Sequence, residues 1–358
     1  MAVQTTRDVI AGLKKGSTWG TEGDVTSAGI NLFASNITLN AVWGEALSRD
    51  FGQTGKLTDV RRLALNVSGS ITCDLTYGQG WLALFAGVMG TESSPSEQTV
   101  SQTDYLVNHD VADTNYGLFW TLGYSIESDR SISLYSMKIT SASFQMAPNS
   151  QGSVTFQFIA DRAVEGSANT VAELIALTDY TYEEATMGGA NHYFRIDTYA
   201  SGTLTNADDK TITGISFEIS RSMSPIFGLR GANTRYAMEP IDFTTRGTLT
   251  VTHSELDNAT YDMLTQWTTP SKLMAELFID GDQIGSGVNS SLKFQWPYLQ
   301  VTGALPTHHD VPNNGTIRNP SITYHMLKAP SAPAGMSGVT DLMRLAEIHR
   351  TRSTKWTA

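Results

Sequence analysis

The segment that decides the fold reads Leu63-Ala64-Leu65-Asn66-Val67-Ser68-Gly69-Ser70-Ile71-Thr72-Cys73-Asp74. Its apolar residues occupy the odd positions, and Gly69 stands at an odd position in the middle. Alternation with a period of two is typical of a β-strand that buries one of its faces. The sequence therefore predicts a long strand over residues 63–75, with the odd-numbered side chains toward a core.

A second segment repeats this pattern, Ile241-Asp242-Phe243-Thr244-Thr245-Arg246-Gly247-Thr248-Leu249-Thr250-Val251-Thr252. It aligns with the first segment without a gap, glycine on glycine. The parity of a strand decides which of its faces is buried, so a copy that keeps the parity keeps the buried face. We infer a tandem duplication of one β-rich unit. A duplicated sheet without an obvious catalytic set indicates assembly rather than catalysis.

Composition narrows the class of protein. The chain has 358 residues, of which 40% are hydrophobic and 16% charged, which predicts about two globular domains. Its net charge of −11 argues against a protein that grips nucleic acid by neutralising phosphates. The single cysteine, Cys73, lies on the apolar parity and is expected to be a buried thiol. We find no secretory signal and no membrane-spanning run, so we expect no membrane partner and a reducing compartment.

The pattern divides the chain into five parts. We expect an N-terminal arm (1–27), a first β domain (28–165), a linker with a short helix (166–190), a second β domain (191–327) and a C-terminal extension with a short helix (328–358). The linker helix is predicted from the spacing of Val171, Leu174 and Ile175. The C-terminal helix is predicted from apolar residues at every third position, Val339, Leu342, Leu345 and Ile348.

Each β domain is expected to contain strands, a long excursion and a short helix. In the first domain the strands are expected at 37–39, 63–75, 118–125, 131–145 and 153–159, the excursion at 44–56, a helix at 81–86 and an exposed loop at 92–115. In the second domain the strands are expected at 215–219, 241–253, 273–279, 291–296 and 321–326, the excursion at 223–236, a turn at 280–282 and a helix at 260–267 capped by Asp257 or Asn258.

No motif predicts catalysis or a cofactor. His308-His309-Asp310 is the one local cluster of metal-ligand types, but it lies in a Pro/Asn/Gly-rich stretch and lacks further ligands nearby, so an exposed loop is the favoured interpretation. The sequence has no nucleophile elbow, phosphate-binding loop or dinucleotide fingerprint. We therefore predict no catalytic, cofactor-binding or metal site and no enzyme, although carboxylate pairs that meet only in space stay open.

The order of elements resembles a known family. A strand, an excursion, a glycine-split strand such as Val67-Ser68-Gly69-Ser70-Ile71, a short helix and late strands occur twice. This order is similar to that of the two-domain tail tube proteins of long-tailed bacteriophages. The resemblance implies β-sandwich or half-barrel domains whose sheets join those of neighbours into a ring. Single-domain members form rings of six, so a tandem member would form a pseudo-six-fold ring of three.

The resemblance also implies a location and partners. Rings would stack into the hollow tail of the virion, through which DNA passes without specific binding. Assembly would take place in the cytoplasm of the bacterial host. Other tail proteins, namely a terminator, a tape measure and a distal tail protein, are the expected partners beside the chain itself.

Two sets of residues are candidates for these roles. The polar parity of the long strands would give an acidic, hydroxyl-rich lumen, with the candidates Asn66, Asp74, Asp242, Thr244, Thr250 and Thr252. In the family the corresponding excursions contact the adjacent ring, which gives the candidates Gly44, Asp50, Lys56, Met223, Arg230 and Tyr236. A mobile surface loop is the alternative for both excursions.

Two other readings of the sequence remain. The chain could be another structural or binding protein, such as a capsid decoration, a tail terminator or a β-sandwich adhesin. It could also be a carbohydrate-active β enzyme with Trp120 or Trp296 as an aromatic platform, although tryptophans within strands more often pack in a core.

Overall fold

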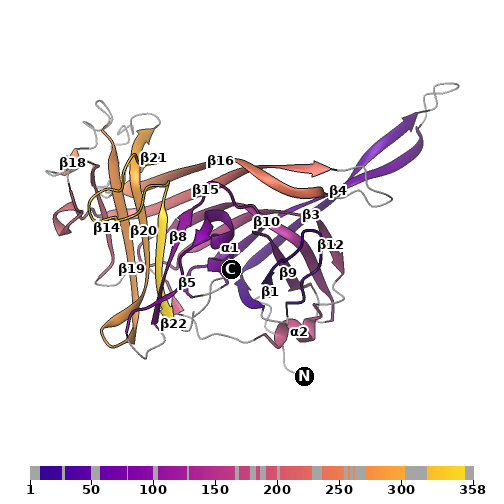
Figure 1. Cartoon of the computed structure of the whole chain (residues 1–358), viewed down its shortest axis with the longest axis horizontal. Coiled ribbons are helices and arrows are strands. Elements are labelled where there is room, and N and C mark those ends of the chain that lie inside the picture. Colours follow the sequence, from indigo (N-terminus) through magenta and orange to yellow (C-terminus); the bar gives the residue numbers. More distant parts are fainter. Residues whose placement is uncertain are drawn as a thin grey trace, which may run out of the picture.

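The computed structural model describes residues 9–25, 29–49, 57–78, 80–99, 104–126, 129–165, 169–177, 183–185, 191–199, 202–227, 236–253, 257–258, 261–262, 271–302 and 321–350. Over these residues the protein is mainly β, as the sequence predicts (Figure 1).

The N-terminal half contains the following elements in chain order: β1 Val9–Lys15, β2 Ile30–Ala34, β3 Asn36–Arg49, β4 Leu57–Asp74, β5 Thr76–Tyr77, α1 Trp81–Met89, β6 Gly90–Glu92, β7 Ser96–Glu97, β8 Asp104–Val111, β9 Trp120–Ser125, β10 Ser131–Met146, β11 Ser153–Ala160, β12 Arg162–Glu165 and α2 Val171–Ile175. The C-terminal half contains β13 Glu183–Glu184, β14 Tyr193–Thr198, the 3-10 turn η1 Asn206–Asp208, β15 Ile212–Phe227, β16 Tyr236–His253, β17 Asp257–Asn258, β18 Tyr261–Asp262, β19 Leu273–Gly285, β20 Val288–Thr302, β21 Ser321–Met326 and β22 Arg344–Arg350.

One antiparallel sheet runs through both halves. Its strands are hydrogen-bonded in the order β3–β4–β11–β10–β15–β16–β21–β20. The halves meet where β10 pairs with β15, with Phe144 opposite Phe217. Each of these strands alternates in polarity, so the sheet has an apolar face toward the core and a polar face toward solvent.

Strands β10 and β20 bend and thereby belong to two layers. The first part of β10 pairs with β9 and β12, and its last part pairs with β11 and β15. A register shift between Leu134 and Met137, where Ser136 has φ 51°, accompanies the bend. Similarly, β20 pairs first with β19 and β22 and then with β21. A second layer of strands thus lies beneath the long sheet in each half, with β9 continuing to β1 and β19 continuing to β14.

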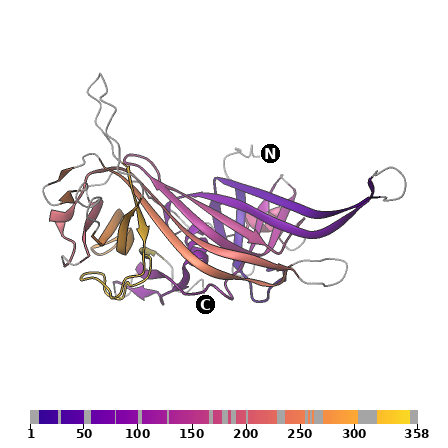
Figure 2. The ribbon, with the colours of Figure 1, turned by 90° about the horizontal axis from the view of Figure 1, so that it is seen from above.

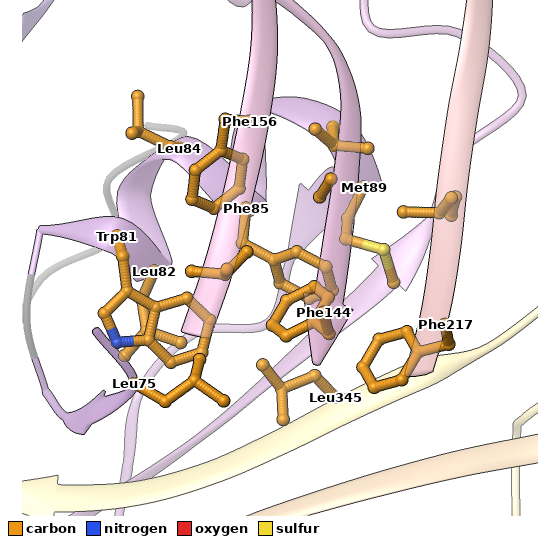
Figure 3. Packing of buried hydrophobic residues seen from close by; sticks show 14 of the residues in the cluster. Leu75, Trp81, Leu82, Leu84, Phe85, Met89, Phe144, Phe156, Phe217 and Leu345 are labelled. Atoms are coloured by element: carbon orange, nitrogen blue, oxygen red, sulfur yellow. The ribbon is translucent and has the colours of Figure 1, made fainter. Parts of the chain in front are cut away.

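Helix α1 fills the space between the layers. All nine of its residues are buried, because the segment is apolar on every side. The rings of Trp81 and Phe85 lie edge-on to Phe144 of β10, with centroids 5.8 and 5.3 Å away (Figure 3). Phe144 in turn stacks on Phe217 of β15 at 4.3 Å. Side chains of both halves therefore form one hydrophobic core, which Leu345 of β22 completes.

Several sequence predictions are confirmed. The strands expected around 63–75, 131–145, 153–159, 241–253 and 321–326 are present as β4, β10, β11, β16 and β21. Helix α1 ends at Met89 and is followed by Gly90 as its C-cap, whose φ of 91° favours glycine. Helix α2 begins with a capping box, in which Thr170 and Glu173 satisfy each other's backbone amides. The thiol of Cys73 is buried as expected.

The predicted C-terminal helix is wrong. Residues 344–350 form β22, which pairs with β20 on one side and with β8 on the other. Burial there follows a period of two, since Leu345, Glu347 and His349 are buried and the residues between them are half-buried. The spacing of apolar residues permits a helix, but two neighbouring strand edges offer backbone hydrogen bonds along the whole segment, which a short helix could not match.

The loop expected over 92–115 is wrong for the same reason, because β8 lies within it and pairs with β22 (Figure 1). The turn expected at 280–282 lies inside β19, where a register shift between Asp280 and Gln283 accommodates it, and the chain reverses at Ser286–Gly287 instead. Residues 257–258 and 261–262 pair as a small sheet rather than capping or beginning a helix, and residues 263–267 are outside the described residues.

Two further segments differ from expectation. Residues 9–15 of the expected N-terminal arm form β1, which pairs with both β2 and β9. The excursions begin as continuations of strands, because β3 runs on to Arg49 and β15 runs on to Phe227. The first parts of both excursions are thus arms of long hairpins rather than loops.

Candidate functional site

The long sheet has a polar face on the side opposite the core. We define it by three solvent-side residues on each of six strands: Ser70, Thr72 and Asp74 of β4; Ser153, Thr155 and Gln157 of β11; Ser141, Ser143 and Gln145 of β10; Ser216, Glu218 and Ser220 of β15; Thr248, Thr250 and Thr252 of β16; and Ser321, Thr323 and His325 of β21. Their register partners lie directly opposite one another across the strands, so these residues share one side of the sheet.

Hydroxyl groups on this face bond to each other across neighbouring strands. The oxygens of Thr38 and Ser70 are 2.6 Å apart, those of Thr72 and Thr155 3.2 Å, and those of Thr250 and Thr323 3.0 Å. Asp74 and Glu218 are the carboxylates of the polar face as defined, and Arg246, the register partner of Ser220, is an exposed cation on the same side of the sheet. The face is therefore wettable and weakly negative, and its polar atoms partly satisfy one another.

Five of the six predicted lumen residues lie on this side of the sheet. Asn66, Asp74 and Thr244 are exposed, and Thr250 and Thr252 are half-buried. Asp242 does not lie there, since its side chain is 2% exposed and accepts hydrogen bonds from Arg221 and Thr114. A register shift between Ser222 and Met223 breaks the parity that the sequence pattern assumes.

Arg221 joins the two halves beneath the sheet. It lies on β15, is 2% exposed, and donates hydrogen bonds to the carbonyls of Val88, Met89 and Ala112 as well as to Asp242. Two of these carbonyls end α1, where the helix dipole favours a cation. Burial lowers the pKa of the Arg221 guanidinium, although the charge and hydrogen bond of Asp242 oppose this shift.

The carboxyl of Asp242 is correspondingly held in its ionised form. Burial alone would raise the pKa of Asp242, but the hydrogen bond from Thr114 and the charge and hydrogen bond of Arg221 outweigh it. The pKa therefore lies below its usual range.

A second buried ion pair lies nearby. Lys138 of β10 contacts Glu239 of β16, and its ammonium also donates to the carbonyls of Asn115 at 3.1 Å and Pro240 at 3.3 Å. Burial lowers the pKa of Lys138, although the hydrogen bond and charge of Glu239 oppose this shift. Our sequence reasoning missed both cations, although Arg221 shares its parity with the apolar Ile219 and Phe217, which was a signal for burial.

The two long hairpins account for the predicted inter-ring residues. Gly44 lies in β3, Met223 lies in β15 and Tyr236 begins β16, whereas Asp50, Lys56 and Arg230 are outside the described residues. Figure 2 shows the purple β3–β4 hairpin and the salmon β15–β16 hairpin leaving the body on the same side. The structure thus places the described candidates on two arms that project on the same side of the body.

The described residues contain none of the features that would indicate a metal site, a sugar-binding platform or a membrane-spanning helix. Among the residues described, no three His, Cys, Asp or Glu side chains cluster as a metal site would require. His308-His309-Asp310 lies outside them. Trp120 and Trp296 are buried at 1% and 0% exposure, so neither can serve as a sugar-binding platform. Within the same described ranges, no helix combines the length and apolarity needed to cross a bilayer.

Comparison with known families decides the assignment. A family model described as phage tail tube protein matches residues 6–318, which include both hairpins and most of the long sheet. The chain belongs to the phage tail tube proteins. Among curated proteins, none matches the chain. Membership in the tail tube family implies a structural role in the virion tail, self-assembly and contacts with other tail proteins, and it points away from an enzyme.

Proposed function

We propose that this tail tube protein is a tandem repeat of one tube-forming unit, and that three copies form a ring with pseudo-six-fold symmetry. Stacked rings would form a hollow tail with the polar face toward the lumen. The two repeats would correspond to residues 28–165 and 191–327, joined by the linker 166–190.

The matching register of the two halves of the sheet carries this proposal. The row Ile37–Ile71–Phe156–Ala142 across β3–β4–β11–β10 corresponds to the row Phe217–Leu249–Tyr324–Val301 across β15–β16–β21–β20. The next row repeats as well, with Leu39–Gly69–Phe158–Ile139 corresponding to Ile219–Gly247–Met326–Leu299. The offset is 178 residues between Gly69 and Gly247 and 180 residues between Leu39 and Ile219, and the order of the four paired strands is the same in both halves.

The chemistry of the polar face supports its assignment to the lumen. Its hydroxyls offer hydrogen bonds without charge, and its carboxylates, Asp74 and Glu218, repel phosphate. Affinity for DNA depends on neutralising phosphates with cations, so a surface on which the carboxylates outnumber the exposed Arg246 lets DNA slide. DNA would accordingly pass through without specific binding when the genome leaves the virion.

The projecting hairpins are proposed to contact the adjacent ring. Both leave the body in the same direction, so all six hairpins of a ring would reach toward one neighbour (Figure 2). The remaining partners would be a terminator, a tape measure and a distal tail protein, with assembly in the host cytoplasm.

Electron microscopy of the purified chain tests the ring. We expect negative-stain images to show stacked rings or tubes, with six-fold features in rotational averages and a ring mass of three chains. Rings that never stack would favour a tail terminator. A monomer at high concentration would contradict the proposal.

Cysteine labelling tests the lumen. Thr323→Cys on the polar face should react with a small maleimide in assembled tubes but not with a maleimide on a large polymer, whereas Ile175→Cys on α2, exposed by 59%, should react with both. Burial raises the pKa of the native Cys73 thiol, so the background reaction should be low. Reaction of both variants with the large reagent would contradict a lumen at this face.

A further inference from the structure

We propose that the open edge of β3 in one copy pairs antiparallel with the end of β20 in a second copy. This inference rests on the proposed function and deepens it, because it names the two edges and their register. Gln300, Val301 and Thr302 of one copy would lie opposite Asn40, Leu39 and Thr38 of the next.

Both edges are open at the ends of the sheet. Among the described strands, β3 pairs with β4 on one side and with none on the other. At the opposite end, β19 leaves β20 at the pair Leu273–Leu299, and beyond Leu299 the described pairings of β20 are those with β21. Unpaired strand edges present backbone donors and acceptors that readily bind another strand.

The join between β10 and β15 supplies the template. There, β9 leaves β10 at the pair Trp120–Met137, and β15 occupies the freed edge from Ser141 onward. The pairs at this join are Ser141–Ser220, Ala142–Ile219 and Ser143–Glu218. Since Val301 corresponds to Ala142 and Leu39 corresponds to Ile219, the same join between copies places Val301 opposite Leu39.

Burial indicates that β3 lacks a cover that β15 has. Ile215, Phe217 and Ile219 of β15 are exposed by 3%, 2% and 0%. The corresponding side of β3 carries Ile37 and Leu39, which pack against the core but are only half-buried. Pairing with a second copy would bury this apolar surface.

The chemistry of the two joins differs. Arg221 follows Ile219 by two residues and Lys138 precedes Ile139. Arg221, which is paired with Asp242, crosses the internal join through hydrogen bonds to three carbonyls of the first half, and Lys138 crosses it through its ion pair with Glu239. The corresponding residues at the open edges are Ala41, two after Leu39, and Tyr298, which precedes Leu299. Burying an ion pair costs free energy because both charges lose their hydration. The join between copies would avoid this cost during assembly, because neither Ala41 nor Tyr298 is charged.

A second copy of the chain is the occupant that fits. Each copy has the β3 edge at one end of its sheet and the β20 edge at the other end. Because the two edges differ, the contact between copies is head-to-tail. A head-to-tail contact closes into a ring when the rotation between copies divides a full turn, which agrees with three copies of a tandem repeat.

Engineered disulfides test the register. Residues opposite one another on antiparallel strands have Cα atoms about 4.5–5.5 Å apart, within the range that a disulfide spans. The test variant is Asn40→Cys with Gln300→Cys. Its off-register control, Asn36→Cys with Gln300→Cys, moves one cysteine four residues, about 13 Å along the strand. The internal control, Ser141→Cys with Ser220→Cys, should close within one chain and confirms that oxidation and folding succeed.

We expect the test variant, oxidised after assembly, to give covalent dimers and trimers on non-reducing gels, at least five-fold more than the off-register control. Dimers from Asn40→Cys alone would show that β3 pairs with β3 and would overturn the inference. Tubes without cross-linked chains would overturn this edge pairing but not the proposed function. Cross-linked oligomers that never form rings would support the edge pairing and overturn the ring. A monomer that does not cross-link would overturn both.

Discussion

Replacement of Arg221 by methionine should destabilise the protein by about 3–5 kcal/mol, the usual cost of breaking a buried ion pair by removing one partner. The guanidinium is 2% exposed and bonds three carbonyls and one carboxylate. Methionine fills much of the space but leaves the carbonyls of Val88, Met89 and Ala112 and the carboxylate of Asp242 without this donor. With an unfolding entropy of roughly 2.1 cal/mol/K per residue over the 358 residues, this loss corresponds to a decrease of about 4–7 °C in Tm.

Differential scanning calorimetry measures this decrease, and hydrogen exchange locates it. Amide protection should fall at the end of α1 and around Ala112, because Arg221 ties both to β15. Arg246→Met is the matched control, since Arg246 lies exposed on the same hairpin and should change stability by less than about 0.5 kcal/mol. Adding Asp242→Asn to Arg221→Met should recover about 1–3 kcal/mol, because the unpaired carboxylate is removed.

Two results would refute this reasoning. A Tm of Arg221→Met within 1 °C of the parent would mean that the carbonyls do not need the guanidinium. A double variant less stable than Arg221→Met would mean that Asp242 has a stabilising role of its own.

Three other changes have definite expected outcomes. Burial lowers the pKa of His109 to about 3 and that of His253 to about 4, so the unfolded chain binds protons that the native chain does not, and stability should fall as pH drops from about 6.5 toward 4. His109→Gln should remove about 1.6 kcal/mol of this loss between pH 6.5 and 5, as urea unfolding at both pH values would measure. Gly69→Ala should lower the free energy of unfolding in urea by about 1–3 kcal/mol, because the new Cβ would lie 2.1 Å from the Thr38 carbonyl oxygen. Gly247→Ala should lower it by less, because there the new Cβ meets the flexible Met326 side chain. Equal losses in the two variants would count against this distinction. Thr250→Lys should make assembled tubes retain short DNA at low salt and release it at high salt, as a filter-binding assay would measure. Thr250→Asn is the neutral control. Equal DNA retention by the two variants would argue against a lumen at this face.

An element of this fold can be predicted from the sequence when its signal lies within the element itself. Elements with a local signal were predictable: α1 from a continuous apolar run between glycines, α2 from the Thr170–Glu173 capping pair, and β4 and β16 from strict alternation. Elements that depend on a distant partner were not. β8 and β22 are 234 residues apart where Arg344 meets Asp110, and each is a strand because the other supplies an edge.

The placement of the predicted lumen residues follows the same rule. Parity placed Thr250, Thr252 and Asp74 on the polar face, because side chains alternate wherever the ladder is regular. Parity failed at Asp242, because one register shift moves a side chain to the opposite face, and such a shift leaves no mark in the pattern of residue types.

The sequence by itself determined that the chain is mainly β, that Gly69 and Gly247 both lie in long strands, and which side of those strands is polar, since all three follow from short-range alternation. Tertiary structure alone decided that β10 joins β15 and that β22 is a strand between β20 and β8. It also decided that Arg221 of β15 donates hydrogen bonds to the last carbonyls of α1. The physical reason is that backbone hydrogen bonds and buried charges require partners brought together by folding, and alternation specifies a face without specifying the neighbour.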